Sequence, residues 1–188
     1  MMFKQTVQDH LKVVNDTFNA EFELSFEKAI NSISRTLKED GKLIFCGNGG
    51  SAGDSQHISA EFISKLQQDR DPLAAISLTV DTSAITAIGN DYGFDNIFSR
   101  QVQALSHPQD TLIALSTSGQ SQNVIMAVKT ALKKGINVIA LTGKNGLQNC
   151  EGLNVIELKV ASNATARIQE VHMLIGHLLC ATCEQEYL

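Results

Sequence analysis

Short apolar runs alternate with helix-length segments along most of the chain, and this alternation is what most constrains the fold. Continuous apolar strands separated by helices are typical of a parallel sheet that helices cover on both faces. The sequence therefore predicts a doubly wound α/β fold with a mainly five-stranded parallel sheet. The predicted strands are Lys42–Cys46, Leu73–Leu78, Thr111–Leu115, Asn137–Leu141 and Leu153–Leu158, and helices are predicted to begin near Ala52, Thr82, Phe94, Gln120 and Thr165.

A helical arm is predicted before the first strand. Apolar residues recur every three or four positions, which is the spacing of one helix face. Both helices of the arm could pack on their own domain, or the first could form a bundle with copies of itself. The first stripe is Val7, Leu11, Val14 and Phe18, the second is Phe22, Phe26, Ile30, Ile33 and Leu37, and Gly41 is the expected end.

The length of 188 residues favours one domain, residues 1–188, with the arm at 1–40 and the α/β core at 41–188. No window reaches the roughly 18 apolar residues of a membrane span, and the amino terminus lacks the apolar core of a leader. The net charge is −5 and the basic residues are dispersed, which argues against a nucleic-acid partner. We expect a cytoplasmic protein with no nucleic-acid or membrane partner, which holds any bound anion by local geometry.

Four cysteines occur in the chain, and we expect them to be reduced. Cys180 and Cys183 form a C-x-x-C pair, but the pair lies inside a late helical pattern rather than at a helix start after a strand. Buried thiols are therefore favoured over a redox site, and a zinc ribbon would need a second pair.

In a doubly wound sheet, ligands bind beyond the carboxyl ends of the strands. The first strand ends in a glycine-rich turn, Gly47–Ala52, that matches G-x-G-x-x-A. The match to a dinucleotide-binding turn is weak, because no acidic residue ends a second strand about 20 positions later. No Gly-Lys-Ser/Thr follows, so a P-loop is excluded, and a turn that binds no ligand remains the simplest alternative.

The third strand leads into four hydroxyl side chains and a glycine, Ser116-Thr117-Ser118-Gly119-Gln120-Ser121, where a helix begins. Helix starts carry unpaired N–H groups and a partial positive charge, and hydroxyls there help to surround a phosphate. A single Ser would be an ordinary N-cap. Four hydroxyls in six residues favour a phosphate-binding loop instead.

Titratable residues gather on two of the predicted helices. His57 and Glu61 are four residues apart, so they share one helix face. They could form half of a metal site or an acid/base pair, although a hydrogen-bonded surface pair is more common. The last helix adds Gln169, His172 and His177 among apolar neighbours. A lone histidine there would usually belong to the core, whereas several polar residues facing a carboxylate favour a site.

Together these segments resemble the sugar isomerase (SIS) domain family and, within it, the phosphoheptose isomerases. The resemblance rests on five blocks in the family's order: CGNGGSAGDSQHISAEF, GNDYGFDNIFSRQV, LIALSTSGQSQNVI, VIALTGKNG and ARIQEVHMLIGH. It implies an SIS fold and an isomerase that interconverts D-sedoheptulose 7-phosphate and D-glycero-D-manno-heptose 7-phosphate through an enediol. It further implies the first step of ADP-heptose synthesis for the lipopolysaccharide core.

The resemblance also assigns roles to individual positions. It implies Glu61 as the general base, His177 as the acid, and a zinc site made by His57, Glu61, Gln169 and His177. Lys65 departs from the arginine of many members, which keeps the charge but loses the planar fork. The implied substrate-binding residues are Asn48, Gly49, Gly50, Ser51, Glu61, Asn90, Asp91, Ser116, Thr117, Ser118, Ser121 and Gln169.

One geometric difficulty accompanies the zinc assignment. Gln169 and His177 lie eight residues apart, which is roughly 12 Å along a straight helix. We therefore expect partial metal occupancy, or a ligand set drawn from more than one chain. The resemblance implies a homotetramer with sites at subunit contacts.

Two non-enzymatic functions remain as alternatives. A related SIS protein binds the bacterial replication initiator without isomerase chemistry, and a sugar-phosphate sensor would bind its ligand tightly without turnover. The presence of His57, Glu61 and His177 favours the enzyme, because a scaffold needs neither an acid nor a base.

Overall fold

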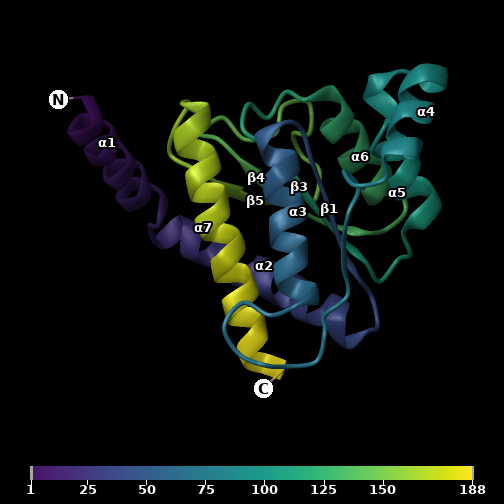
Figure 1. Cartoon of the computed structure of the whole chain (residues 1–188), viewed down its shortest axis with the longest axis horizontal. Coiled ribbons are helices and arrows are strands. Elements are labelled where there is room, and N and C mark those ends of the chain that lie inside the picture. Colours follow the sequence, from purple (N-terminus) through teal and green to yellow (C-terminus); the bar gives the residue numbers. More distant parts are fainter. Residues whose placement is uncertain (1, 188) are drawn as a thin grey trace.

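The computed structural model describes residues 2–187. Its five strands form one sheet in the order β2-β1-β3-β4-β5, and all pairs are parallel (Figure 1). The predicted α/β fold with a five-stranded parallel sheet is therefore confirmed. The elements are α1 Met2–Thr17, α2 Ala20–Lys38, β1 Leu43–Gly47, α3 Gly50–Ile63, β2 Ala75–Ser77, α4 Thr82–Tyr92, η1 Phe94–Asn96, α5 Ser99–Leu105, β3 Thr111–Ser116, α6 Gln122–Lys133, β4 Asn137–Thr142, β5 Ile156–Lys159, α7 Thr165–Glu184 and η2 Gln185–Tyr187.

The strand order reverses between β1 and β3. The chain moves outward from β1 to β2, then returns to the other side of β1 for β3, β4 and β5. Such a reversal opens a crevice beyond the carboxyl ends of the two central strands. The glycine-rich turn follows β1 and the serine-rich loop follows β3, so both lie at this crevice.

The core consists of two apolar layers, one on each face of the sheet. Along β1, Leu43 and Phe45 belong to the layer with α2, α3 and α7, whereas Ile44 and Cys46 belong to the layer with α5 and α6. Successive strand residues point to opposite faces, so both sets are buried only when helices cover both sides. This requirement explains the continuous apolar runs of the sequence.

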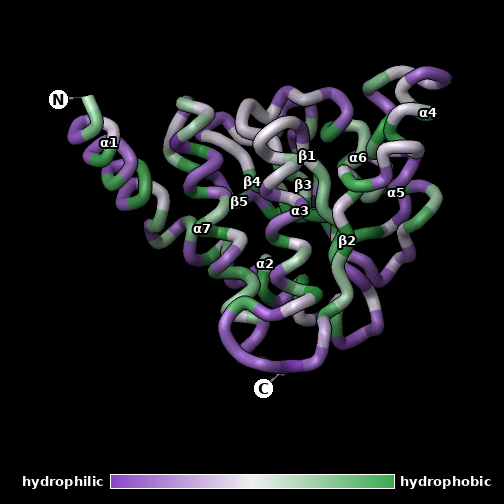
Figure 2. Tube along the Cα trace, in the orientation of Figure 1, coloured by the Kyte–Doolittle hydropathy of each residue, from purple (hydrophilic) through white to green (hydrophobic). Residues whose placement is uncertain are grey.

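The amino-terminal arm contains two helices, as predicted, and Asn19 separates them. Its side-chain oxygen accepts hydrogen bonds from the N–H groups of Glu21 and Phe22, both at 3.0 Å, which caps α2. The predicted stripe on α1 divides in two. Val14 and Phe18 pack against the core, whereas Val7 and Leu11 are 53% and 55% exposed. Figure 1 shows α1 projecting away from the rest of the molecule, and Figure 2 shows apolar residues along it.

Some element boundaries differ from the prediction. The last strand begins at Ile156 rather than Leu153, because the preceding residues form a turn in which the N–H of Leu153 donates to Cys150 O. The second strand is only Ala75–Ser77. The helix expected near Phe94 is a single 3-10 turn, and α5 begins at Ser99. Apolar runs mark what is buried, and backbone pairing decides where a strand starts.

All four cysteines are free and buried, as expected. Burial raises the pKa of Cys46 and of Cys183 to about 12 and that of Cys180 to about 11. A thiol with such a pKa is protonated and unreactive.

Among residues 2–187, no helix combines the length and the apolar character that crossing a bilayer requires.

Candidate active site

The glycine-rich turn brings the chain from β1 into α3. Gly49 has φ of 56°, a left-handed conformation that favours glycine, and α3 begins at Gly50. Asn48 and Asn123 exchange two side-chain hydrogen bonds of 2.8 Å, which join this turn to the start of α6. The predicted sugar-binding residues Asn48, Gly49, Gly50 and Ser51 are therefore neighbours at one helix start.

The serine-rich loop connects β3 to α6. Ser116 Oγ donates to Ser121 Oγ at 3.2 Å, and Ser118 Oγ accepts from the N–H of Gln120 at 3.1 Å. Ser121 occupies the N-cap position of α6 but makes no capping hydrogen bond with its side chain. Gly119 has φ of 68°, and a β-carbon there would overlap the carbonyl group of Gly146, so the loop path requires glycine.

Hydroxyl groups and the first N–H groups of α6 thus occupy the same end of the crevice. A phosphate there would be held by helix-start N–H groups and neutral hydroxyls, without a basic cluster. The assignment of Ser116, Thr117, Ser118 and Ser121 to phosphate binding remains a prediction that this geometry favours.

Helices α3 and α7 run side by side in the same direction (Figure 1). Gly50 of α3 lies against Gln169, and Ile58 lies against Gly176, where a β-carbon would overlap it. Because Gly50 of α3 and Gly176 of α7 carry no side chain, the two helices can approach closely. The close approach brings polar residues of two distant sequence segments together.

His57, Glu61 and His177 meet where α3 and α7 are in contact. The Nε2 atoms of His57 and His177 are 3.2 Å apart, and His57 Nε2 is 3.4 Å from Glu61 Oε1. The side chains of His57 and Glu61 are 51% and 23% exposed, so solvent and small molecules reach them. The structure therefore brings together three of the four predicted metal ligands, and two of these three, Glu61 and His177, are also the predicted catalytic residues.

Gln169 lies apart from this group within the chain. Its side-chain amide contacts Gly50, which precedes His57 by seven residues, or roughly 10 Å along the helix. The structure thus keeps the separation between Gln169 and His177 that the helix spacing predicts, and Gln169 lies beside the glycine-rich turn. Its role as a fourth zinc ligand remains a prediction.

Asn90 and Asp91 lie on α4 and are exposed. Asn90 Nδ2 donates to Asp91 Oδ1 at 2.7 Å, and the hydrogen bonds of residues 2–187 connect neither side chain to the crevice. Their predicted contact with substrate is therefore not explained by the geometry of one chain.

His172 belongs to the core rather than to the site. It is fully buried, and its Nε2 lies 3.2 Å from the carbonyl oxygen of Thr142. Burial lowers the pKa of His172 to about 4, so the ring is neutral near pH 7. The interpretation that groups His172 with Gln169 and His177 as site residues is therefore wrong at this position, and the alternative of a core histidine holds.

His57, Glu61 and His177 are donors that suit a zinc ion, although their arrangement in the structure does not form a complete set of zinc ligands. In a tetrahedral site with Zn–N bonds of 2.0–2.1 Å, neighbouring ligand atoms are about 3.3 Å apart. The separations of 3.2 and 3.4 Å at His57 match that value. Yet no group of three or more His, Cys, Asp or Glu side chains in residues 2–187 is arranged so that it could hold a metal ion. The donor types fit zinc, and holding it requires a side-chain rotation or a further ligand.

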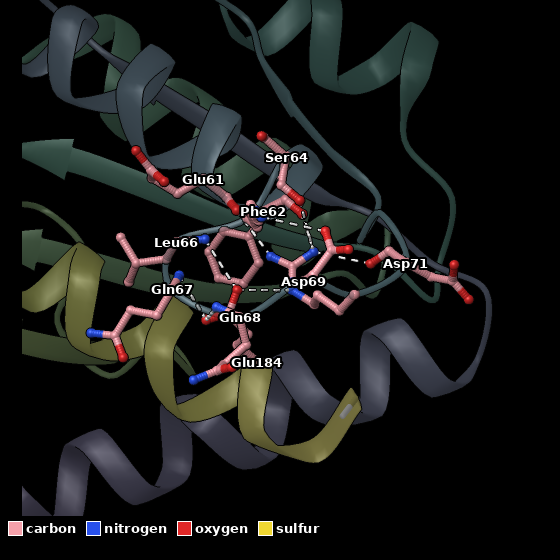
Figure 3. A network of polar contacts seen from close by, with 11 residues as sticks. Glu61, Phe62, Ser64, Leu66, Gln67, Gln68, Asp69, Asp71 and Glu184 are labelled. Carbon is pink, nitrogen blue, oxygen red and sulfur yellow. Dashed lines mark hydrogen bonds and ion pairs between the residues drawn. The ribbon is translucent and has the colours of Figure 1, made fainter.

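A buried ion pair that the sequence reasoning missed fixes the end of α3 (Figure 3). Arg70 Nε lies 3.3 Å from Glu184 Oε1, and the two side chains are 0% and 2% exposed. Arg70 also donates to the carbonyl oxygens of Glu61 and Phe62, both at 2.9 Å. These bonds satisfy carbonyls of the last turn of α3, so Arg70 holds the backbone that carries Glu61.

Glu184 holds the loop that follows α3. Its carboxylate accepts hydrogen bonds from the N–H groups of Leu66, Gln67 and Gln68, at 3.0 to 3.2 Å. Burial raises the pKa of Glu184, but the three N–H donors and Arg70 outweigh it and hold the pKa below its usual range. No motif signalled this pair, because its members are separated by more than a hundred residues. Lys65, by contrast, is exposed and pairs with Asp69.

The comparisons with known proteins agree with this geometry. The sequence model of the SIS domain family matches residues 3–143. The phosphoheptose isomerase of Shewanella loihica is 53% identical over 158 residues, or 83% of this chain and 80% of that protein. The phosphoheptose isomerase of Campylobacter concisus is 45% identical over 188 residues, or 99% of both proteins.

Solved structures show the same likeness. A phosphoheptose isomerase from Francisella tularensis superposes with a TM-score of 0.92 at 39% identity, and one from Neisseria gonorrhoeae with 0.88 at 40% identity. Each comparison covers 98% of this chain and 97% of the other. The chain belongs to the SIS domain family. Within that family, these relatives are phosphoheptose isomerases.

Proposed function

We propose that this chain is a sugar-phosphate isomerase that interconverts D-sedoheptulose 7-phosphate and D-glycero-D-manno-heptose 7-phosphate. The observation that carries the proposal is the meeting of Glu61 with His57 and His177 where α3 and α7 are in contact. Relatives of 45% and 53% identity that are named phosphoheptose isomerases support the same activity. A scaffold or a sensor would not require both an acid and a base.

The reaction needs a base that moves one proton between neighbouring carbons. Glu61 takes the proton from carbon 1 of the ketose and returns it to carbon 2 of the cis-enediol. His177 acts as the acid that protonates and polarises the sugar oxygens. The phosphate group binds at Ser116, Thr117, Ser118 and Ser121, and the sugar hydroxyls bind at the glycine-rich turn.

The direct test is an NMR assay of the purified protein with sedoheptulose 7-phosphate. Signals of the seven-carbon aldose phosphate should appear until the two sugars reach equilibrium. Tight binding of the ketose without any aldose signal would instead favour a sensor and would refute the isomerase proposal. We propose the first step of ADP-heptose synthesis for the lipopolysaccharide core as the place of this reaction. Free, buried cysteines are consistent with a cytoplasmic site of action.

We further propose that one zinc ion binds at His57, Glu61 and His177, and that Gln169 of a neighbouring copy of the chain completes the set, because Gln169 of the same chain lies beside Gly50. When bound, the ion would hold substrate oxygens and share the negative charge that develops on them.

After dialysis against zinc and removal of free metal, we expect about one zinc per chain by elemental analysis, and much less in His57→Asn. Equal zinc in His57→Asn and in the unchanged protein would exclude this ligand set. A His107→Asn variant provides the matched control, because His107 lies away from α3 and α7, in the loop before β3.

We also propose a homotetramer that forms through α1. Phe3, Val7 and Leu11 are 62%, 53% and 55% exposed on this helix. A groove of about 330 Å³ lies nearby, lined by Phe18, Phe22, Phe26 and Leu178 among others. The exposed face of α1 and this groove are apolar surfaces that a second copy of the chain would cover.

Leu11→Glu should therefore lower the mass of the assembly in light scattering from about four chains to two or one. The expected cause is the cost of burying a carboxylate in an apolar interface. Gln5→Glu adds the same charge elsewhere on α1 and should leave the mass unchanged. A tetramer that survives Leu11→Glu would show that α1 is not part of the interface.

A further inference from the structure

Asp54 lies on the face of α3 that carries the site. Gly50, Asp54, His57 and Glu61 are spaced by four, three and four residues, which places them along one side of a helix. Gly50 contacts Gln169, and His57 contacts His177. Asp54 therefore lies between these two contacts, about one turn from each. None of the roles implied for the site includes this carboxylate.

One carboxylate oxygen of Asp54 lacks a partner. Oδ2 is shielded from solvent and makes no hydrogen bond to any residue of the described range 2–187. An unpaired buried oxygen of a carboxylate costs free energy, so native proteins usually give it a donor. Burial raises the pKa of Asp54, and the nearby His57 lowers it.

His57 has a donor position that faces away from the site. Its Nε2 lies toward Glu61 and His177, so Nδ1 is on the other side of the ring, and no hydrogen bond involves it among residues 2–187. Side chains three residues apart on a helix are neighbours, with β-carbons about 5–6 Å apart. The helix spacing therefore places the unpaired Nδ1 of His57 within one turn of the unpaired Oδ2 of Asp54.

We propose that Asp54 is a positioning residue for the isomerase reaction: its carboxylate accepts a hydrogen bond from Nδ1–H of His57 and fixes the tautomer of that ring. The proposal rests on the proposed function. A histidine ring held this way presents the lone pair of Nε2 on its opposite side. His57 thus offers an acceptor, not a donor, toward Glu61 and His177.

This tautomer decides which histidine carries the proton in their contact. The two Nε2 atoms are 3.2 Å apart, so one must donate and the other accept. If His57 accepts, the proton is on Nε2 of His177, the residue assigned as the acid. Asp54 thereby sets the direction of this hydrogen bond through His57, without touching the substrate. This arrangement describes the metal-free site, because a zinc ion would need the lone pairs of both histidines.

The test combines a tautomer measurement with kinetics. In ¹⁵N-histidine-labelled protein, two-bond ¹H–¹⁵N spectra should show His57 protonated on Nδ1, with its signals assigned by their loss in His57→Asn. In Asp54→Asn the Nδ1–H form should lose its preference. We expect kcat to fall by about 10- to 100-fold with little change in KM. Asp69→Asn makes the same chemical change on an exposed side chain and should have no effect.

Two results would overturn the proposal. One is a His57 ring protonated on Nε2 in the unchanged protein, which can be observed whether or not any variant folds. The other is an Asp54→Asn variant whose tautomer and kcat match those of the unchanged protein. The spectrum does not depend on turnover, so a failure of the proposed isomerase activity would be seen separately. Urea unfolding of Asp54→Asn checks that a lower kcat does not reflect a loss of folded protein.

Discussion

Replacement of Glu61 by Gln should lower kcat by about 10³-fold, within the range of 10²–10⁴ that a general base contributes. Gln has nearly the shape of Glu but cannot take a proton, and its side-chain amide can still donate a hydrogen bond to Nε2 of His57. The chemical step should therefore suffer far more than substrate affinity. The measurement is the NMR assay with sedoheptulose 7-phosphate, together with calorimetric titration of the inactive variant with the same sugar.

Glu39→Gln is the matched control for this prediction. Glu39 is exposed at the end of α2, away from the crevice, and the same substitution there should leave kcat unchanged. If Glu61→Gln turned over at the normal rate, Glu61 could not be the base. A large loss of affinity with normal kcat would make Glu61 a binding residue instead.

The second large effect is on stability. Arg70→Met should reduce the free energy of unfolding by about 3–5 kcal/mol, the usual cost of leaving one member of a buried ion pair without its partner. Such a loss is a large part of the roughly 5–15 kcal/mol that stabilises most domains. The variant would also lose the donors to Glu61 O and Phe62 O. Urea unfolding measures the first effect, and kcat under folding conditions measures the loosening of Glu61.

Lys65→Met removes a charge from the neighbouring exposed pair and should change stability by less than about 1 kcal/mol. Equal effects of Lys65→Met and Arg70→Met would contradict a specific role for the buried pair.

The pH dependence of the free energy of unfolding offers a second check on the buried pair. Because the pKa of Glu184 is lowered in the folded state, its stabilisation is complete above the pKa of the unfolded chain. It is lost as pH falls through the folded value, and Glu184→Gln should remove this acid-dependent part.

The candidate site was predictable to the extent that its residues follow strands or share a helix face. His57 and Glu61 could be paired from their spacing alone, and the serine-rich loop could be placed after a strand. The contact of His57 with His177 could not be obtained from spacing, because it depends on how α7 lies against α3. Nothing in the local sequence marked Arg70, Asp54 or Glu184, since only their burial gives them roles.

The sequence alone determined the class of fold, because a chain with five continuous apolar runs between helices buries them well only in a covered parallel sheet. It also determined the loops at which the candidate ligand-binding groups occur, since those loops follow the strands. Only the tertiary structure decided which distant side chains meet. The approach of α3 to α7 at Gly50 and Gly176 is a matter of packing, and packing depends on all the surrounding residues at once.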